Sequence, residues 1–141
     1  MIFSNAELVS AVKECLQLSP EGHCAKSSHG AIAEWDVSRI TNMDNTFSEA
    51  HLFNGYISDW DVSSVTDMAS LFKGASEFDQ DLSKWDVSIV RNMAMMFTTA
   101  SAFNQDLSKW DVSKVTDMWA MFWDARAFNR DLSKWDVSAV T

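Results

Sequence analysis

The sequence predicts an α/β solenoid, with short parallel strands on one face, short helices on the other, and a helical cap at the N-terminus. The first observation behind this prediction is a fixed spacing of 25 residues between successive tryptophans, at Trp35, Trp60, Trp85, Trp110 and Trp135. A fixed period of this size is the signature of stacked-repeat architectures. The second observation is that each interval joins a strand-like pattern to a helix-like pattern. Their alternation predicts parallel strands with right-handed crossovers.

The first 31 residues do not follow the repeat, and we expect residues 1–31 to form the N-terminal cap. Ser4 or Asn5 can cap a helix there. One apolar face follows at helical spacing, with Leu8, Val12, Cys15 and Leu16. The helix is expected to end near Leu18, because a segment with proline and glycine follows it. A stacked-repeat array needs such an atypical end unit to cover its first coil.

Residues 32–141 are predicted to be the repeat solenoid, with four full units from Trp35 and a partial fifth. The strand of each unit ends in a Trp-x-Val pattern, which alternates as a strand does. The expected strands are Ile32–Val37, Ile57–Val62, Leu82–Val87, Leu107–Val112 and Leu132–Val137. A helical stripe then follows, as at Val115, Met118, Phe122 and Ala125. We expect the repeated Trp, Met and Phe positions to form the core.

Three consecutive units carry a resemblance to a known family. They read WDVSSVTDMASLFKGASEFDQDLSK, WDVSIVRNMAMMFTTASAFNQDLSK and WDVSKVTDMWAMFWDARAFNRDLSK. This pattern resembles the BspA-like leucine-rich repeat family, also known as DUF285 or the bacterial surface protein repeat. The resemblance implies a leucine-rich-repeat-like solenoid, a role in binding or adhesion, and no catalytic residues. It also implies a cell-surface or extracellular location, although the chain has no signal-peptide pattern.

Composition limits the partners of the chain. The formal net charge is −9, which repels nucleic-acid phosphates and favours basic proteins or cations. No apolar run is long enough to span a membrane. The only cysteines, Cys15 and Cys24, are too few for a disulfide scaffold. Three states of these cysteines remain open: a single disulfide, two free thiols, or a metal site. No cofactor is expected.

An acidic patch is predicted on the strand face of the first two units. An aspartate follows each repeated tryptophan, and Lys84, Lys109 and Lys134 are expected to neutralise it in the last three units. The first two units lack this lysine, which leaves the carboxylates of Glu34, Asp36, Asp59 and Asp61. They would form a docking patch for a basic partner or a weak Ca²⁺ site. Alternatively, each aspartate caps the next turn and the other acids are solvated.

Trp119 and Trp123 are the most local functional signal in the chain. They stand where the preceding unit has Ala94 and Thr98, so the core does not demand them. Exposed neighbouring aromatics are favoured interface anchors. The alternative is that both side chains pack against the helix of the neighbouring coil.

We therefore predict a non-catalytic protein-interaction or adhesion module. The alternative is a structural subunit or scaffold held in a larger multi-protein assembly. No catalytic constellation accompanies the acidic residues, so no enzyme activity is expected. The last coil has no cap, which predicts end-to-end self-association or a longer parent array.

Overall fold

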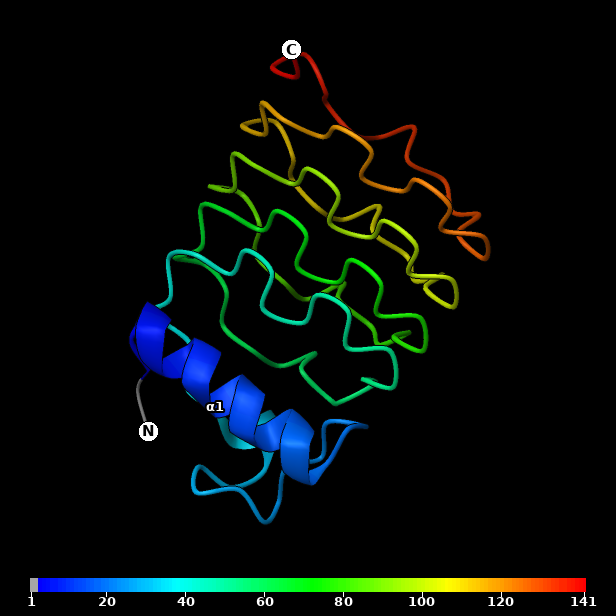
Figure 1. Ribbon diagram of the computed structural model, residues 1–141. Coiled ribbons are helices and arrows are strands. Elements are labelled where there is room, and N and C mark those ends of the chain that lie inside the picture. Colours follow the sequence, from blue (N-terminus) through cyan, green and yellow to red (C-terminus); the bar gives the residue numbers. More distant parts are fainter. Residues whose placement is uncertain (1–2) are drawn as a thin grey trace.

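The computed structural model describes residues 3–141 as a stack of irregular coils that repeat every 25 residues, with a helix at one end (Figure 1). The helix, α1, spans Asn5–Leu18, and a short 3-10 helix, η1, spans Ile32–Glu34. Isolated parallel bridges join successive coils at one position each, namely Asn42 with Asp67, Asp67 with Asn92, and Asn92 with Asp117. The C-terminus lies at the opposite end of the stack from α1.

The sequence pattern correctly predicts α1. Ser4 is its N-cap and forms a reciprocal capping box with Glu7, in which each backbone N–H is bonded by the other residue's side chain. Leu8, Val12 and Cys15 of the predicted apolar face are buried, and so is Ala11, whereas Leu16 is only partly buried. The helix ends at Leu18, where the N–H of Ser19 donates to the carbonyl of Cys15.

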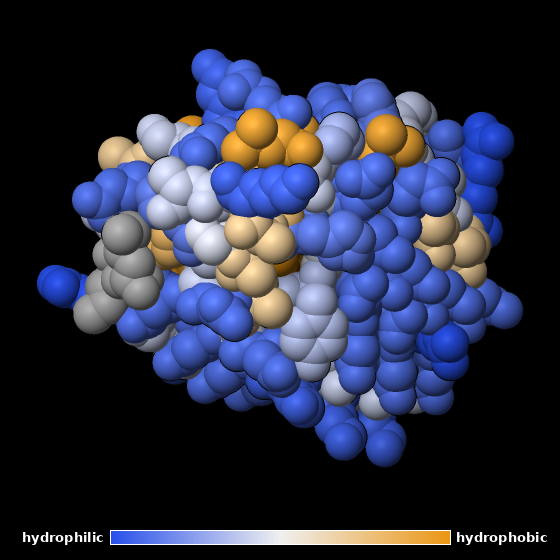
Figure 2. Space-filling view, turned by 90° about the horizontal axis from the view of Figure 1, so that it is seen from below, coloured by the Kyte–Doolittle hydropathy of each residue, from blue (hydrophilic) through white to orange (hydrophobic). Residues whose placement is uncertain are grey.

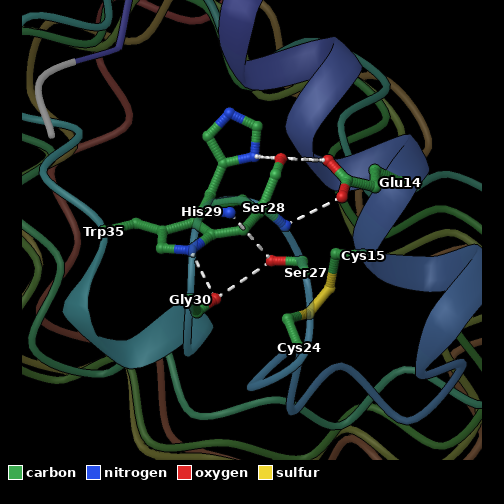
Figure 3. Close-up of polar contacts among 8 residues, drawn as sticks. All are labelled: Glu14, Cys15, Cys24, Ser27, Ser28, His29, Gly30 and Trp35. Atoms are coloured by element: carbon green, nitrogen blue, oxygen red, sulfur yellow. Dashed lines mark hydrogen bonds and ion pairs between the residues drawn. A yellow bond between two sulfur atoms is a disulfide. The ribbon is translucent and has the colours of Figure 1, made fainter.

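A disulfide and a carboxylate fasten α1 to the segment that follows it (Figure 3). Cys15 and Cys24 are joined, with their Cα atoms 5.0 Å apart. Glu14, which directly precedes Cys15, accepts hydrogen bonds from the backbone N–H and the hydroxyl of Ser28, at 2.8 and 2.6 Å. These hydrogen bonds lower the pKa of Glu14 below its usual value. The return segment therefore holds α1 against the end of the stack.

The prediction of an α/β solenoid with parallel strands and outer helices is wrong. Helix accounts for 12% of the chain, and residues in isolated bridges account for the 4% that is extended. There is no sheet in the part of the chain that the structure describes. The segment Ile32–Val37 contains η1 and no strand. None of the other four predicted strands forms, and the helices predicted after each of them are absent from residues 35–141.

Successive β-turns replace the predicted helices. In the third unit, the N–H groups of Met96, Thr98 and Ala100 donate to the carbonyls of Met93, Met95 and Phe97. Every fourth residue of these segments has a positive φ, as at Met95 with 57° and Thr99 with 55°. An α-helix cannot contain this left-handed conformation, because it redirects the chain at every turn. The helical spacing of apolar residues therefore reflects a ribbon of turns.

Side-chain turns replace the predicted strands. At each end of the Leu82–Val87 segment an aspartate bonds the backbone two residues later, with Asp81 accepting from Ser83 and Asp86 accepting from Ser88. Such aspartate turns offer the backbone a local partner and bend it away from an extended path. Between them, the N–H of Trp85 donates to the carbonyl of Leu82, which closes a further turn.

The predicted core is confirmed in the first three units, whereas Met118, Phe122 and Trp135 are only partly buried. Trp35, Trp60, Trp85 and Trp110 are each at most 5% exposed, and the repeated Met and Phe positions of the first three units are fully buried. The rings stack from coil to coil, with centroids of Phe47 and Phe72 5.8 Å apart and those of Phe72 and Phe97 5.6 Å apart. Each unit thus buries its aromatic side chains against the same positions of its neighbours.

Candidate functional site

Trp119 and Trp123 are the most exposed large aromatic side chains among the described residues, at 70% and 66%. Both lie in the turn ribbon of the fourth unit. Met121, between them in sequence, is buried at 4% exposure. The ribbon therefore directs residues 119 and 123 to the surface while residue 121 fills the core.

The backbone below the two tryptophans is held firmly by the preceding coil. The carbonyls of Trp119 and Trp123 each accept a backbone hydrogen bond at 2.8 Å, from Met95 and Thr99. The hydroxyl of Thr98 donates to the carbonyl of Ala120 at 2.6 Å. The N–H of Trp119 donates to the carboxylate of Asp117. The indole rings are thus presented on an ordered support, which limits the entropy lost when a partner binds.

The two indoles border an open apolar groove with a volume of about 560 Å³. We call it the tryptophan groove; its lining consists of Lys73, Met95, Thr98, Trp119, Ala120 and Trp123. Three successive units contribute to it. Lys73 is the only charged residue of this lining. The groove can accept a bulky apolar side chain, and it carries no acid–base pair.

The structure does not gather the four predicted acidic residues into one site. Asp36 and Asp61 each accept from the backbone and hydroxyl of the serine two residues later. These bonds from Ser38 lower the pKa of Asp36. Glu34 lies in η1 and is exposed. The aspartates after each tryptophan therefore cap turns.

Asp59 has its own partners. Lys84 lies 3.0 Å from its carboxylate, and the hydroxyl of Tyr56 donates to it at 2.9 Å. The hydrogen bond from Lys84, followed by that from Tyr56, lowers the pKa of Asp59. Lys84 thus pairs with the acid of the preceding unit, whereas the sequence pattern predicted neutralisation of the aspartate in its own unit. A hollow of about 270 Å³ brings Asp59, Asp61, Lys84 and Asp86 together.

Across residues 3–141, no group of three or more His, Cys, Asp or Glu side chains is arranged to hold a metal ion. Cys15 and Cys24 form the disulfide described above. His29 packs beside Glu14, with 3.4 Å between its Nδ1 and the carboxylate, and its ring contacts Phe3. Cys15, Cys24 and His29 therefore all serve the N-terminal cap.

Sequence reasoning selected Trp119 and Trp123 but missed the rest of the groove. Met95 lies outside the repeated methionine positions that we assigned to the core; it is partly buried and lines the groove. Lys73 comes from a unit two repeats away from the tryptophans.

Comparison with known proteins assigns the chain to a family. No curated protein and no solved structure shows significant similarity to it. In the described part of the chain, no helix has the length and apolar character needed to cross a bilayer. The model of a family described as "Mycoplasma protein of unknown function, DUF285" matches residues 20–135, which include most of the repeat region. The chain therefore belongs to the DUF285 family.

Proposed function

We propose that the chain is a non-catalytic protein-interaction module and that the tryptophan groove is its contact surface. The observation that carries this proposal is the exposure of Trp119 and Trp123 beside an apolar groove on a fixed backbone. Aromatic side chains anchor interfaces because they bury a large area and lose little entropy when they become ordered. The same positions of the other units carry small or polar side chains, or Lys73.

The groove favours a polypeptide partner that inserts a bulky apolar side chain between the two indoles. The net charge of −9 favours binding to a positively charged partner and opposes binding to nucleic acid. Electrostatic attraction between the acidic chain and a basic partner accelerates association and weakens as salt is added. The apolar contact supplies the affinity, and the surrounding charge selects the partner.

A peptide display library with randomised apolar and basic positions tests the proposal. Peptides selected on the wild-type chain should bind the Trp119→Ala/Trp123→Ala variant at least about tenfold more weakly. The matched control is Leu52→Ala/Tyr56→Ala, which removes two exposed side chains elsewhere. The control should bind as the wild type does. Selected peptides that bind both double variants equally well would contradict the proposal.

The alternative is a structural subunit or scaffold held in a larger assembly. One observation favours it: Trp119 and Trp123 are 70% and 66% exposed beside an apolar groove, and a permanent partner would bury them. In that case the native particle should keep its size on dilution, whereas a regulated interaction module should be recovered as a free monomer.

A location at the cell surface stays part of the proposal, because it comes from the resemblance to BspA-like surface proteins. The finer leucine-rich-repeat attribution stays a prediction as well. Protease treatment of intact source cells tests the location, since a surface protein should lose its epitope without cell lysis.

A further inference from the structure

Lys73 differs from the residues at its position in the other units. Its equivalents are Ser48, Thr98 and Trp123, so the repeat does not require a charge there. The side chain of Lys73 is half-buried and lines the apolar tryptophan groove. A lysine in such a setting packs its methylene stem along the apolar surface and leaves its ammonium group at the edge. The ammonium of Lys73 therefore stands at the rim of the groove.

No acidic residue of the described chain pairs with this ammonium. Within residues 3–141, the four ion pairs involve other cationic side chains. Glu49 is bonded to the backbone of Lys73, with its N–H donating to the Lys73 carbonyl at 2.7 Å. The Glu49 carboxylate, however, lies 3.8 Å from Nε2 of His51. Lys73 thus keeps an unpaired positive charge beside an apolar surface.

The groove extends from Lys73 to the indoles across the third unit. Thr98 of that unit lies between Lys73 and Trp123, and its hydroxyl is already bonded to a backbone carbonyl. Stacked phenylalanine rings of these three units are 5.6 and 5.5 Å apart, and Lys73 and Trp123 are separated by two such steps. An extended chain advances about 3.3 Å per residue. Side chains held at the two ends of the groove would therefore lie within about three residues of each other.

We propose that the groove binds a polypeptide segment in which an aspartate or glutamate lies within about three residues of a bulky apolar side chain. The apolar side chain packs between the indoles over Met95, and the carboxylate pairs with Lys73. This inference rests on the function proposed above and names the chemistry of its partner. The net charge of −9 attracts a partner that is basic as a whole, whereas the groove itself selects an acidic residue.

A side-chain carboxylate fits the groove better than the carboxylate of a chain terminus. Terminal carboxylates are captured by clusters of free backbone N–H groups. In this lining, the N–H groups of Lys73, Met95 and Thr98 are each bonded to a backbone carbonyl. The ammonium group at the rim can pair with an acidic side chain of a segment that continues in both directions along the open groove.

The α1 end of the stack differs from the tryptophan groove. Figure 2 shows this end, where apolar side chains form separate patches within a largely hydrophilic face. A hollow of about 350 Å³ at this end is lined by Glu49 and His51 as well as by apolar side chains such as Leu16. Glu49 and His51 already pair with each other there. The tryptophan groove, with its unpaired ammonium, is therefore the surface whose charge specifies its occupant.

Selection from a displayed peptide library tests the charge of the partner. The library consists of short peptides with one fixed phenylalanine and random flanking residues, and a linker follows each peptide so that no free terminus is offered. Peptides selected on the wild-type chain should be enriched in Asp or Glu within about three residues of the phenylalanine. On Lys73→Glu, the enrichment should change to Lys or Arg, because like charges repel.

The matched control for this selection is Lys109→Glu, which changes the net charge equally at an exposed site outside the groove. It should select acidic residues as the wild type does. The same enrichment on Lys73→Glu as on the wild type overturns the proposal. Binding that requires a second library with free C-termini overturns it as well, because a terminal carboxylate would then be the occupant.

Fluorescence anisotropy with one selected peptide measures the pairing. Changing its acidic residue to the corresponding amide should weaken binding to the wild type at least about threefold, because an ion pair at an exposed rim contributes modestly. Lys73→Met keeps an apolar stem and removes the charge. This variant should bind the acidic peptide at least about threefold more weakly and should not distinguish it from the amide peptide. Equal affinity of the wild type and Lys73→Met for the acidic peptide overturns the pairing.

The same assay separates this inference from the proposed function. Trp119→Ala/Trp123→Ala should weaken the binding of the acidic and amide peptides alike, because both use the apolar contact. If this variant loses binding while Lys73→Met does not, the groove is the contact surface and the acidic preference is wrong. If Trp119→Ala/Trp123→Ala binds as the wild type does, the groove is not the contact surface and both proposals fail.

Discussion

The ammonium group of Lys84 lies 3.0 Å from the carboxylate of Asp59, a residue of the preceding unit. Their separation of one repeat means that stacking of the units brings them together. Asp86, which follows Lys84 by two residues, instead accepts from the backbone of Ser88. The charge pairing on this surface therefore runs between coils.

Removal of this lysine should raise the pKa of Asp59. Lys84 is the main cause of its lowered value, through a hydrogen bond to the ionised carboxylate. In Lys84→Met, a pH titration followed by carboxyl NMR should place the Asp59 pKa closer to its usual 3.8. The control is Lys109→Met, which should leave the Asp59 titration unchanged. An identical shift in both variants would contradict the contact.

Acid should weaken the fold through the aspartate turns. Their carboxylates, such as those of Asp86 and Asp111, have a pKa below the usual 3.8 because serine groups donate to them. A carboxyl whose folded pKa is depressed stabilises the fold above its unfolded pKa, and this contribution is lost as pH falls through the folded pKa. The urea midpoint should therefore fall on acidification from about pH 5 toward about pH 2.

The variant Asp86→Asn/Asp111→Asn provides the matched control for the acid effect. Each asparagine oxygen can still accept from the serine N–H, but it does not titrate. The double variant should lose less of its urea midpoint on acidification than the wild type does. An equal loss in both proteins would show that other groups cause the acid sensitivity.

The aromatic stack should be most sensitive in its interior. Phe97 is fully buried and contacts the rings of Phe72, Phe103 and Phe122. Phe97→Ala should lower the free energy of unfolding by about 3–5 kcal/mol, measured by urea denaturation. Phe122→Ala should cost less, because Phe122 in the fourth unit is only partly buried. Equal losses would contradict this difference in burial.

Gly74 should tolerate a side chain poorly because of its backbone conformation. Its φ is +71°, a left-handed value that strains any residue with a Cβ. An added Cβ would also meet the Glu49 carboxylate at 2.5 Å, but this carboxylate is the end of an exposed, flexible side chain and can move aside. Gly30 has a similar φ of +73° and nothing near the position of a Cβ. Gly74→Ala and Gly30→Ala should therefore each lose about 1–2 kcal/mol of unfolding free energy, measured by urea denaturation.

A larger loss at Gly74 would contradict the free movement of Glu49. Glu49→Ala combined with Gly74→Ala should then recover the difference, because a double-mutant cycle isolates the contact between the two sites.

The capping helix and the apolar core could be predicted because their signals are local or strictly periodic. Ser4 and Glu7 stand at the spacing of a capping box, and Phe72 and Phe97 recur at the repeat interval. The groove lining could not be predicted in full. Lys73 and Met95 meet Trp119 only after the units stack, and their positions depend on the turn ribbon that the helical interpretation missed.

The sequence by itself determined the repeat, the identity of the stacked residues and the N-terminal cap, because repetition at 25 residues forces equivalent side chains to share one core. The tertiary structure decided the backbone conformation of each coil. Met93 and Met95 bond to the next coil, while Met96 and Thr98 close turns within their own. Apolar spacing cannot distinguish this division of hydrogen bonds from a helix, because both satisfy the backbone and bury the same side chains.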